Sequence, residues 1–329
     1  MDKKIVLSGM RPTGNLHFGN YFGALENWIN LQDTYDCHFF IADWHALTTG
    51  YDDTEDLSEN TYRIIADYLA CGLDPEKCII FLQSMIQEHA ELHLMLSMTT
   101  PLSWLERCPT YKDQIANLSE KDIMTYGFLG YPCLMSSDIL LYNADFVPVG
   151  EDQIPHLELT REIARRFNHI YKTDLLKEPG ALLTKAKLLP GTDGRKMSKS
   201  YNNTISFSDT PEDVDRKVMS MVTDPARIRK TDPGHPDVCS AYSFHKVFSE
   251  EEIPEIRRAC EAGEIGCVQC KRKLAANIAE FHNPIHHKRT ELLKDKTFLK
   301  QVLTRGSEKA RIIASETMQK VKSAVKIGI

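Results

Sequence analysis

The sequence predicts an α/β protein with a doubly wound parallel sheet, followed by an all-helical C-terminal domain. Two observations lead to this prediction. Short apolar runs alternate with segments of helical periodicity in the first half of the chain, and strand signals stop after about residue 205. Strands that alternate with helices form βαβ units, which build a parallel sheet.

Each expected element follows from a local pattern. Apolar runs bounded by turn residues predict strands at residues 4–9, 37–42, 77–82 and 145–150. Apolar residues at helical spacing predict helices at residues 20–32, 54–70, 154–167, 211–221, 250–260, 268–282 and 296–326. We therefore expect a Rossmann-like domain at 1–195, a polar loop at 196–200 and a helical domain at 201–329.

Length and composition set the class of protein. The chain has 329 residues, of which 42% are hydrophobic and 26% charged, so we expect about two globular domains. No run of about 18 apolar residues and no signal-peptide pattern is present, which predicts a cytoplasmic protein without a membrane partner. Nine cysteines in that setting are thiols or metal ligands rather than disulfides. Five lie in apolar contexts typical of a core: Cys37, Cys71, Cys78, Cys108 and Cys133.

The charge is unevenly distributed. The whole chain carries a net charge of −6, but residues 288–329 hold 11 Lys and Arg against 4 Asp and Glu, a net +7. Residues 1–287 therefore carry a net charge of −13. This bias has two interpretations, a solvated helix face or a surface that binds a polyanion.

Two polar motifs indicate a nucleotide site. The first strand leads into a glycine-containing turn, Gly9 to Asn20, directly before a helix, where backbone N–H groups can approach phosphates. The second motif is Gly194-Arg-Lys-Met-Ser-Lys-Ser200, which has no apolar period and reads as a loop. Taken separately, the first could be an ordinary turn and the second a linker.

Together the two motifs resemble the paired signatures of the class I aminoacyl-tRNA synthetases, His-x-Gly-Asn at residues 17–20 and Lys-Met-Ser-Lys-Ser at 196–200. The resemblance implies a HIGH/KMSKS-type Rossmann-like fold and attack of an amino-acid carboxylate on the α-phosphorus of ATP, with transfer of the acyl group to tRNA. It implies catalytic roles for Lys196, Lys199, Arg11 and His17. It implies ATP contacts for Arg11, Pro12, Thr13, His17, Gly19, Asn20, Gly150, Glu151, Asp152, Leu188, Lys196, Met197, Ser198, Lys199 and Ser200, with Mg²⁺ as the accompanying cation.

A third segment indicates the amino acid. Tyr131, Met135 and Asp138 fall at i, i+4 and i+7, on one face of a helix. A carboxylate in so apolar a run needs a donor, and an acceptor in a flat apolar pocket suits the indole N–H. A purely structural pairing of Asp138 is the alternative.

The block at residues 131–168 resembles the tryptophanyl-tRNA synthetase branch of that family, and the resemblance runs from residue 4 to about 325. It implies that Asp138 binds the indole N–H. The other tryptophan contacts it implies are Met135, Tyr131, His45, Val147, Val149, Gln153, Gly9 and Leu7. Many bacterial members of the family have Gln where this chain has Arg11, and Thr where it has His17. Arg11 adds positive charge near the triphosphate of ATP, so the dependence on Mg²⁺ stays open.

Four late cysteines form a possible metal site. Cys239, Cys260, Cys267 and Cys270 follow the spacing C-x20-C-x6-C-x2-C, which suits zinc or an iron–sulfur cluster, while four separate structural thiols are the alternative. A subset of bacterial tryptophanyl enzymes resembles this pattern, which favours a [4Fe–4S] cluster, with Zn²⁺ next.

The expected function is therefore ligation of tryptophan to tRNA(Trp). The partners are L-tryptophan, ATP and tRNA(Trp), with a homodimer implied by the family and no DNA. A tyrosyl-type synthetase of the same fold, an inactive tRNA-binding paralogue and an adenylyltransferase of the same superfamily are the alternatives.

Overall fold

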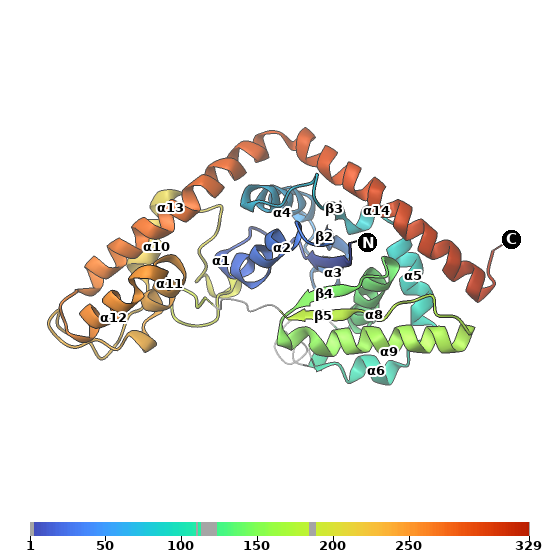
Figure 1. The fold of residues 1–329 in the computed structure, drawn as a ribbon, viewed down its shortest axis with the longest axis horizontal. Helices are drawn as coiled ribbons and strands as arrows, with labels where there is room; N and C mark the ends of the chain where they lie inside the picture. The colour runs from blue at the N-terminus through green and yellow to red at the C-terminus, as the bar shows by residue number, and fades with distance from the viewer. Residues whose placement is uncertain (1–2, 110, 113–123, 184–188, 329) are drawn as a thin grey trace. The chain divides into compact units, whose positions relative to one another are not determined.

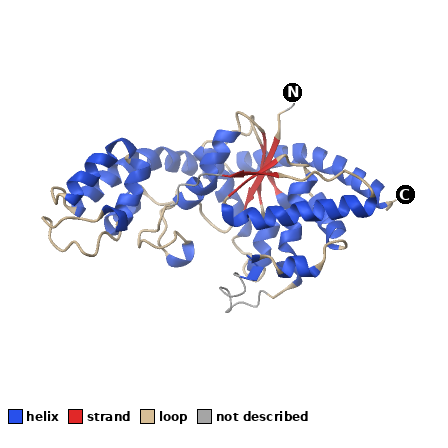
Figure 2. Ribbon diagram, turned by 60° about the horizontal axis from the view of Figure 1, so that its bottom comes forward, coloured by secondary structure: helices blue, strands red, loops and turns tan. Residues whose placement is uncertain are grey.

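The structure is a computed structural model that describes residues 3–109, 111–112, 124–183 and 189–328, with only the backbone of Ser200. Its five strands form one sheet, drawn in red in Figure 2. They are β1 (Ile5–Met10), β2 (Asp36–Ile41), β3 (Ile79–Leu82), β4 (Phe146–Val149) and β5 (Gly180–Leu183). Every pairing is parallel, which confirms the predicted α/β class with a doubly wound sheet.

The strand order is β3-β2-β1-β4-β5. From β1 the chain adds β2 and β3 on one side, and it later adds β4 and β5 on the other. The direction of winding reverses between β1 and β4. In open parallel sheets, ligands bind outside the carboxyl ends of the strands at such a reversal, so the sheet alone indicates where a site belongs.

Contacts divide the chain into two compact units (Figure 1). Unit 1 contains residues 1–14, 27–185 and 295–329, and unit 2 contains residues 15–26 and 186–294. These units group the residues differently from the predicted order along the chain, because the turn at 15–26 joins unit 2 and the last helix joins unit 1. The division into functional domains at 195 and 201 stays a prediction.

The helices of unit 1 pack on the sheet and on one another. They are α2 (Glu26–Leu31), α3 (Asp43–Gly50), α4 (Leu57–Cys71), α5 (Glu88–Ser97), α6 (Leu102–Glu106), α8 (Tyr126–Leu141), α9 (Ile154–Tyr171) and α14 (Lys296–Val325), with short 3₁₀ turns η2 (Gln83–Met85) and η3 (Glu151–Gln153). None of the described helices is both long and apolar enough to span a membrane.

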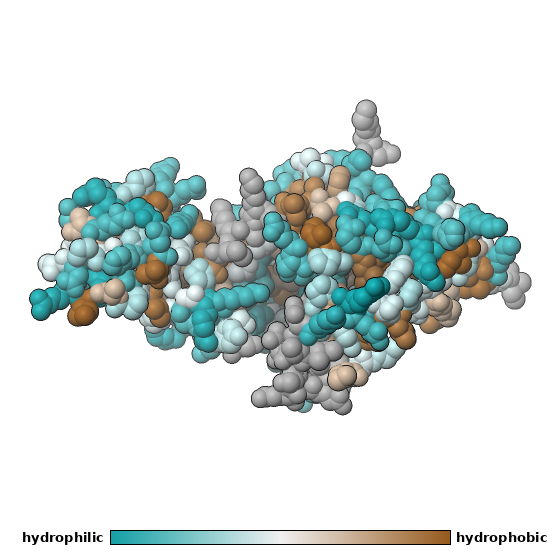
Figure 3. Space-filling view, turned by 90° about the horizontal axis from the view of Figure 1, so that it is seen from below, coloured by the Kyte–Doolittle hydropathy of each residue, from teal (hydrophilic) through white to brown (hydrophobic). Residues whose placement is uncertain are grey.

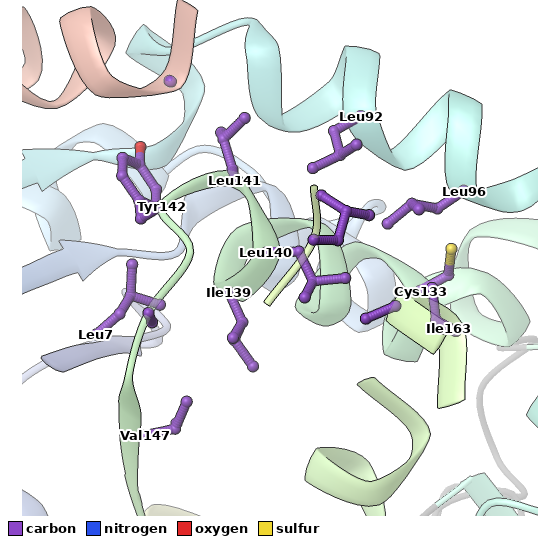
Figure 4. Packing of buried hydrophobic residues seen from close by; sticks show 14 of the residues in the cluster. Leu7, Leu92, Leu96, Cys133, Ile139, Leu140, Leu141, Tyr142, Val147 and Ile163 are labelled. Atoms are coloured by element: carbon purple, nitrogen blue, oxygen red, sulfur yellow. The ribbon is translucent and has the colours of Figure 1, made fainter. Parts of the chain in front are cut away.

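Helix α8 lies at the centre of the unit 1 core. The Thr125 hydroxyl caps its first turn by accepting from the Phe128 N–H. Ile139, Leu140 and Leu141 of α8 are at most 2% exposed and pack with residues of β1, β4, α5 and α9 (Figure 4). Four of the five scattered cysteines are buried as predicted, namely Cys37, Cys78, Cys108 and Cys133, whereas Cys71 is only partly buried.

Helix α14 packs along β3, the strand at one edge of the sheet. Gly306 makes this close approach possible, because a Cβ atom there would lie 1.8 Å from the Ile80 carbonyl oxygen. The Ser307 hydroxyl accepts a hydrogen bond from the Leu82 N–H at 3.3 Å. An exposed edge strand invites pairing with other chains, and α14 covers this one.

The basic side chains of α14 are partly neutralised within unit 1. Three of them form ion pairs with glutamates of that unit, Lys296 with Glu59 (2.6 Å), Arg305 with Glu76 (3.4 Å) and Lys322 with Glu91 (2.7 Å). Arg311 donates to the Met85 carbonyl. The three paired basic side chains are still 41–65% exposed, which is consistent with the interpretation of the tail as a solvated helix face.

Unit 2 is built around an aromatic cluster. Its helices are α1 (Phe18–Asn20), continued by the π-helical turn η1 (Tyr21–Leu25), α10 (Pro211–Ser220), α11 (Ser240–Phe248), α12 (Ile253–Glu261) and α13 (Cys267–Lys294), with 3₁₀ turns η4 (Lys199–Tyr201), η5 (Pro236–Val238) and η6 (Glu250–Glu252). Phe18 is fully buried, and its ring lies 5.4–5.8 Å from those of Phe207, Phe248 and Phe281. This cluster holds the turn at residues 15–20 against α11 and α13.

The elements differ from the prediction in several places. No residue ranges were predicted for helices α3, α5 and α6. Strand β5 was not predicted, because its sequence Gly-Ala-Leu-Leu contains no β-branched or aromatic residue. Helix α11 was not predicted either. Helix α13 continues through Pro284 to Lys294 instead of ending near residue 282, so the proline there does not end the helix.

Candidate active site

The first group of predicted site residues lies in unit 1, on the two strands that flank the reversal. Leu7 on β1 and Val147 and Val149 on β4 are each at most 6% exposed. Gly9 is required by packing, because a Cβ at this position would lie 2.5 Å from the Phe40 ring. The resemblance implies that these four residues contact tryptophan, and they lie on two neighbouring strands, β1 and β4.

Asp138 of α8 is buried, 1% exposed, and surrounded by donors. Gln83 Nε2 lies 2.8 and 3.0 Å from its two oxygens, His89 Nδ1 lies 2.6 Å from Oδ1, and His45 Nε2 lies 2.8 Å from Oδ2. Burial alone would raise the pKa of Asp138, but the hydrogen bonds from His45 and His89 lower it to about 2. The carboxylate is therefore ionised at neutral pH.

Gln83 and His89 were missed by the sequence analysis. Gln83 directly follows β3, at the carboxyl end of a strand, so its position did carry a usable signal. His89 carried none, because it lies in α5, 49 residues before the aspartate that it contacts. His89 Nε2 also lies 2.8 Å from the Tyr142 hydroxyl, so both ring nitrogens are hydrogen-bonded.

Tyr131 and Met135 share the α8 face with Asp138, as predicted, and both are partly buried. The Tyr131 hydroxyl lies 2.9 Å from His156 Nε2. Tyr131 also acts electrostatically on Arg11 at the end of β1, where burial lowers the pKa of Arg11 and Tyr131 opposes that shift. These contacts place the phenol close to the turn that follows β1.

The predicted residues after β4 form the turn η3. Gln153 Nε2 donates to Asp152 Oδ2 at 2.8 Å. A Cβ at Gly150 would lie 2.7 Å from Asp152 Oδ1, so this carboxylate packs close over the glycine. Glu151 and Asp152 are exposed, so their carboxylates can meet a polar ligand from solvent.

The second group of predicted residues lies in unit 2, around His17. The His17 N–H donates to the Asn20 side chain at 3.1 Å, and the Phe18 N–H donates to the Ile205 carbonyl at 2.9 Å. Burial, followed by the nearby charge of Lys199, lowers the pKa of His17 to about 4, so the imidazole is neutral at pH 7. Its Nδ1 is buried and has no hydrogen-bond partner among the described residues, which is unusual in a folded protein unless a ligand supplies one.

The lysine loop is tied to this turn through Met197. This side chain is 7% exposed, and its sulfur accepts from the Gly19 N–H at 3.3 Å. Lys196 and Lys199 are exposed. The predicted residue Leu188 lies outside the described residues, as does the side chain of Ser200.

Asn203, which the sequence analysis also missed, shapes the loop from within. It is 2% exposed. Its Oδ1 accepts from the Ser198 N–H at 2.8 Å, and its Nδ2 donates to Asp193 Oδ1 at 2.8 Å and to the Lys196 carbonyl at 3.1 Å. One buried amide therefore fixes the backbone on both sides of Met197.

The four late cysteines line a single pocket in unit 2. Burial, and then the neighbouring Cys239, Cys260 and Cys267, raise the pKa of the Cys270 thiol to about 12. Arg227 Nη1 lies 3.7 Å from Cys260 Sγ and 4.0 Å from Cys267 Sγ. As the side chains stand, no three His, Cys, Asp or Glu residues in the described ranges are arranged to hold a metal ion.

These features define the chain as a doubly wound α/β protein in which several predicted site residues lie on the strands that flank the switch point of the sheet. The family model described as tRNA synthetases class I (W and Y) matches residues 2–283. This match covers most of the chain, so the chain belongs to that family.

Named relatives agree with this assignment. The chain is 48% identical to a tryptophan–tRNA ligase of Thermotoga maritima and 44% identical to one of Aquifex aeolicus, covering 98% of this chain and 99% of each relative. A crystal structure of tryptophanyl-tRNA synthetase from Campylobacter jejuni, complexed with ADP and tryptophan, superposes with a TM-score of 0.90 at 36% identity, covering 98% of this chain and 100% of that one. A tyrosyl-tRNA synthetase from Archaeoglobus fulgidus shares the fold at a TM-score of 0.67 and 20% identity, over 89% of this chain and 90% of that one.

Proposed function

We propose that this chain activates L-tryptophan with ATP and transfers the tryptophanyl group to tRNA(Trp). The observation that carries the proposal is Asp138, an ionised carboxylate buried on an apolar helix face and hydrogen-bonded to His45 and Gln83, which follow the carboxyl ends of β2 and β3. An indole offers one N–H and a flat apolar ring, and it has no acceptor. Relatives that align over nearly the whole chain carry the name of this activity.

The tryptophan pocket is built by unit 1. Asp138 accepts the indole N–H, and the residues around it form the apolar walls and polar rim. These are Leu7, Gly9, His45, Tyr131, Met135, Val147, Val149 and Gln153. A buried acceptor of this kind favours a ring system that carries an N–H donor.

ATP is bound by residues of the glycine-containing turn and the lysine loop. His17 Nδ1, buried without a partner among the described residues, is suited to a phosphate oxygen, and Gly19 and Asn20 complete the turn that carries it. Arg11, Pro12, Thr13, Gly150, Glu151, Asp152 and Leu188 contact the remaining parts of the nucleotide. Mg²⁺ bound to the phosphates adds positive charge when present.

The chemistry requires alignment and neutralisation of charge. The attacking carboxylate is already an anion, so no general base is needed. Lys196, Lys199 and Arg11 stabilise the negative charge on the departing pyrophosphate, while Met197, Ser198 and Ser200 hold the loop that carries the lysines. The neutral His17 donates a hydrogen bond without adding charge.

The helical domain predicted at residues 201–329, with its basic C-terminal helix, is proposed to bind the anticodon of tRNA, and a cytoplasmic location follows from that role. A homodimer is proposed as the working assembly. Exposed apolar side chains at α5 and α6 support it, since Leu94 of α5, Met98 directly after α5 and Leu102 of α6 are each more than half exposed. Figure 3 shows further hydrophobic residues, in brown, at the surface of the molecule.

A [4Fe–4S] cluster bound by Cys239, Cys260, Cys267 and Cys270 is the finer proposal for unit 2. Four soft thiolate donors on one pocket fit such a cluster, which would stabilise the surrounding helices. Gly234 leaves room for Cys260, because a Cβ there would lie 2.5 Å from its sulfur.

Protein purified without oxygen should then be brown and contain about four irons per chain. Cys267→Ser should bleach it, whereas Cys71→Ser, which changes a cysteine of unit 1, should not. One zinc and no iron in the anaerobic sample would replace the cluster with a structural zinc site.

ATP–pyrophosphate exchange with each amino acid separately tests the main proposal. Exchange driven by tryptophan alone is the expected result. Exchange driven by tyrosine would indicate a tyrosyl-type enzyme, and no exchange with any amino acid would indicate an inactive paralogue.

A further inference from the structure

Asp138 has no free acceptor site in this structure. An ionised carboxylate offers about four lone-pair positions, two on each oxygen. Oδ1 accepts from Gln83 and His89 at 2.8 and 2.6 Å, and Oδ2 accepts from Gln83 and His45 at 3.0 and 2.8 Å. An indole N–H can therefore bind only if one of these donors leaves.

Two of the three donors are fixed. Gln83 and His89 are both completely buried. Gln83 Oε1 also accepts from the Trp44 N–H at 3.2 Å, and His89 Nε2 lies 2.8 Å from the Tyr142 hydroxyl. Moving either side chain would leave several buried polar groups without partners, which is costly.

His45 is the donor that can leave. Its side chain is 12% exposed, whereas that of Asp138 is 2% exposed, so a released imidazole can reach water. Its backbone stays in place during such a movement, because the His45 carbonyl accepts from the Thr48 hydroxyl at 2.8 Å within α3. Only rotation of the side chain is needed.

We infer that His45 is a specificity-determining residue that occupies the indole N–H position on Asp138 Oδ2 in the empty pocket and gives it up when tryptophan binds. The inference rests on the proposed role of Asp138. A ring of the same shape without an N–H cannot replace His45 as donor. His45 then keeps its bond to Oδ2, and the carboxylate stays paired.

The test compares two ligands on the full chain. Binding of L-tryptophan and of 3-(benzothiophen-3-yl)alanine, in which sulfur replaces the indole N–H, is measured by titration calorimetry. In the unaltered protein His45 compensates for the missing N–H. In His45→Leu nothing does, so the ratio of the two dissociation constants should rise about tenfold, the value of one unpaired buried acceptor.

His93→Leu is the matched control. His93 lies on α5, half-buried, near enough to Asp138 and His45 to interact electrostatically, but without a hydrogen bond to the aspartate. The ratio of the two dissociation constants in His93→Leu should equal that of the unaltered protein. An unchanged ratio in His45→Leu would overturn the inference, since it would mean that the two donors do not compete.

A second measurement needs no variant. Crystal structures of the unaltered protein with and without tryptophan should show His45 Nε2 more than 3.5 Å from Asp138 when the ligand is bound. A retained hydrogen bond overturns the inference. If tryptophan does not bind, or binds equally well to Asp138→Ala, the proposed function fails instead.

Discussion

At the scale of single residues, the site depends on a carboxylate that the protein keeps charged in its interior. The free-energy cost of burying Asp138 is offset by three donors from α3, η2 and α5. Removing one partner of such a network leaves the others unpaired, which costs more than the net value of the hydrogen bond itself. Asp138 therefore contributes to both recognition and stability.

Asp138→Ala should reduce kcat/KM for tryptophan in pyrophosphate exchange by about 10-fold to 100-fold, corresponding to about 1–3 kcal/mol. The KM for ATP should change little. The pKa of Asp138 is about 2, so tryptophan binding to the unaltered protein should not weaken through its protonation between pH 8 and 5. Normal activation of tryptophan by the variant would mean that Asp138 is purely structural.

At the scale of elements, the lysine loop depends on a single buried amide. Asn203→Ala removes three side-chain hydrogen bonds to the loop backbone and Asp193. We expect the rate of adenylate formation to fall about tenfold or more, with the dissociation constant for tryptophan unchanged. Single-turnover kinetics measures the rate of adenylate formation, and calorimetry measures the dissociation constant for tryptophan.

Tyr201→Phe is the control for the loop. Tyr201 is 53% exposed, and its ring, which the substitution keeps, stacks against Arg195 at 4.5 Å. This variant should retain its activity. An equal loss of tryptophan affinity in Asn203→Ala would show that the effect reaches beyond the loop.

Helix α14 offers a test of packing. Gly306→Ala places a methyl group 1.8 Å from the Ile80 carbonyl, so the helix has to move away from β3. The free energy of unfolding, measured by urea denaturation, should fall by about 2–4 kcal/mol. Gly50→Ala is the control, because a Cβ there meets no atom within 4 Å. Equal stability of the two variants would contradict the described packing.

How much the sequence revealed depended on how local each feature is. Asp138 and the four cysteines were found because their residue types conflict with their surroundings or recur at a telling spacing. Gln83, His89 and Asn203 act through contacts that only the folded chain creates. Strand β5 lacks the β-branched and aromatic residues that signal a strand, and α14 gives no sequence sign that it packs on a strand more than 200 residues earlier.

At the scale of the whole molecule, the chain crosses between its two units four times, at residues 14/15, 26/27, 185/186 and 294/295. Unit 1 is completed by α14, so residues 1–195 alone lack the helix that covers β3. We expect this fragment to aggregate or to be digested rapidly by protease. Adding residues 295–329 as a separate peptide should restore protection. A stable, monomeric fragment 1–195 would show that α14 is dispensable.

The position of α14 also has a consequence for biosynthesis. A ribosome releases all five strands of the sheet well before it releases the helix that shields β3. During that interval the growing chain presents an unprotected strand edge, and such edges recruit neighbouring chains on the same messenger. The interval lengthens with every pause between codons 183 and 296. Chaperones that bind nascent chains would therefore be needed most over that stretch, after the sheet has formed and before its cover has emerged.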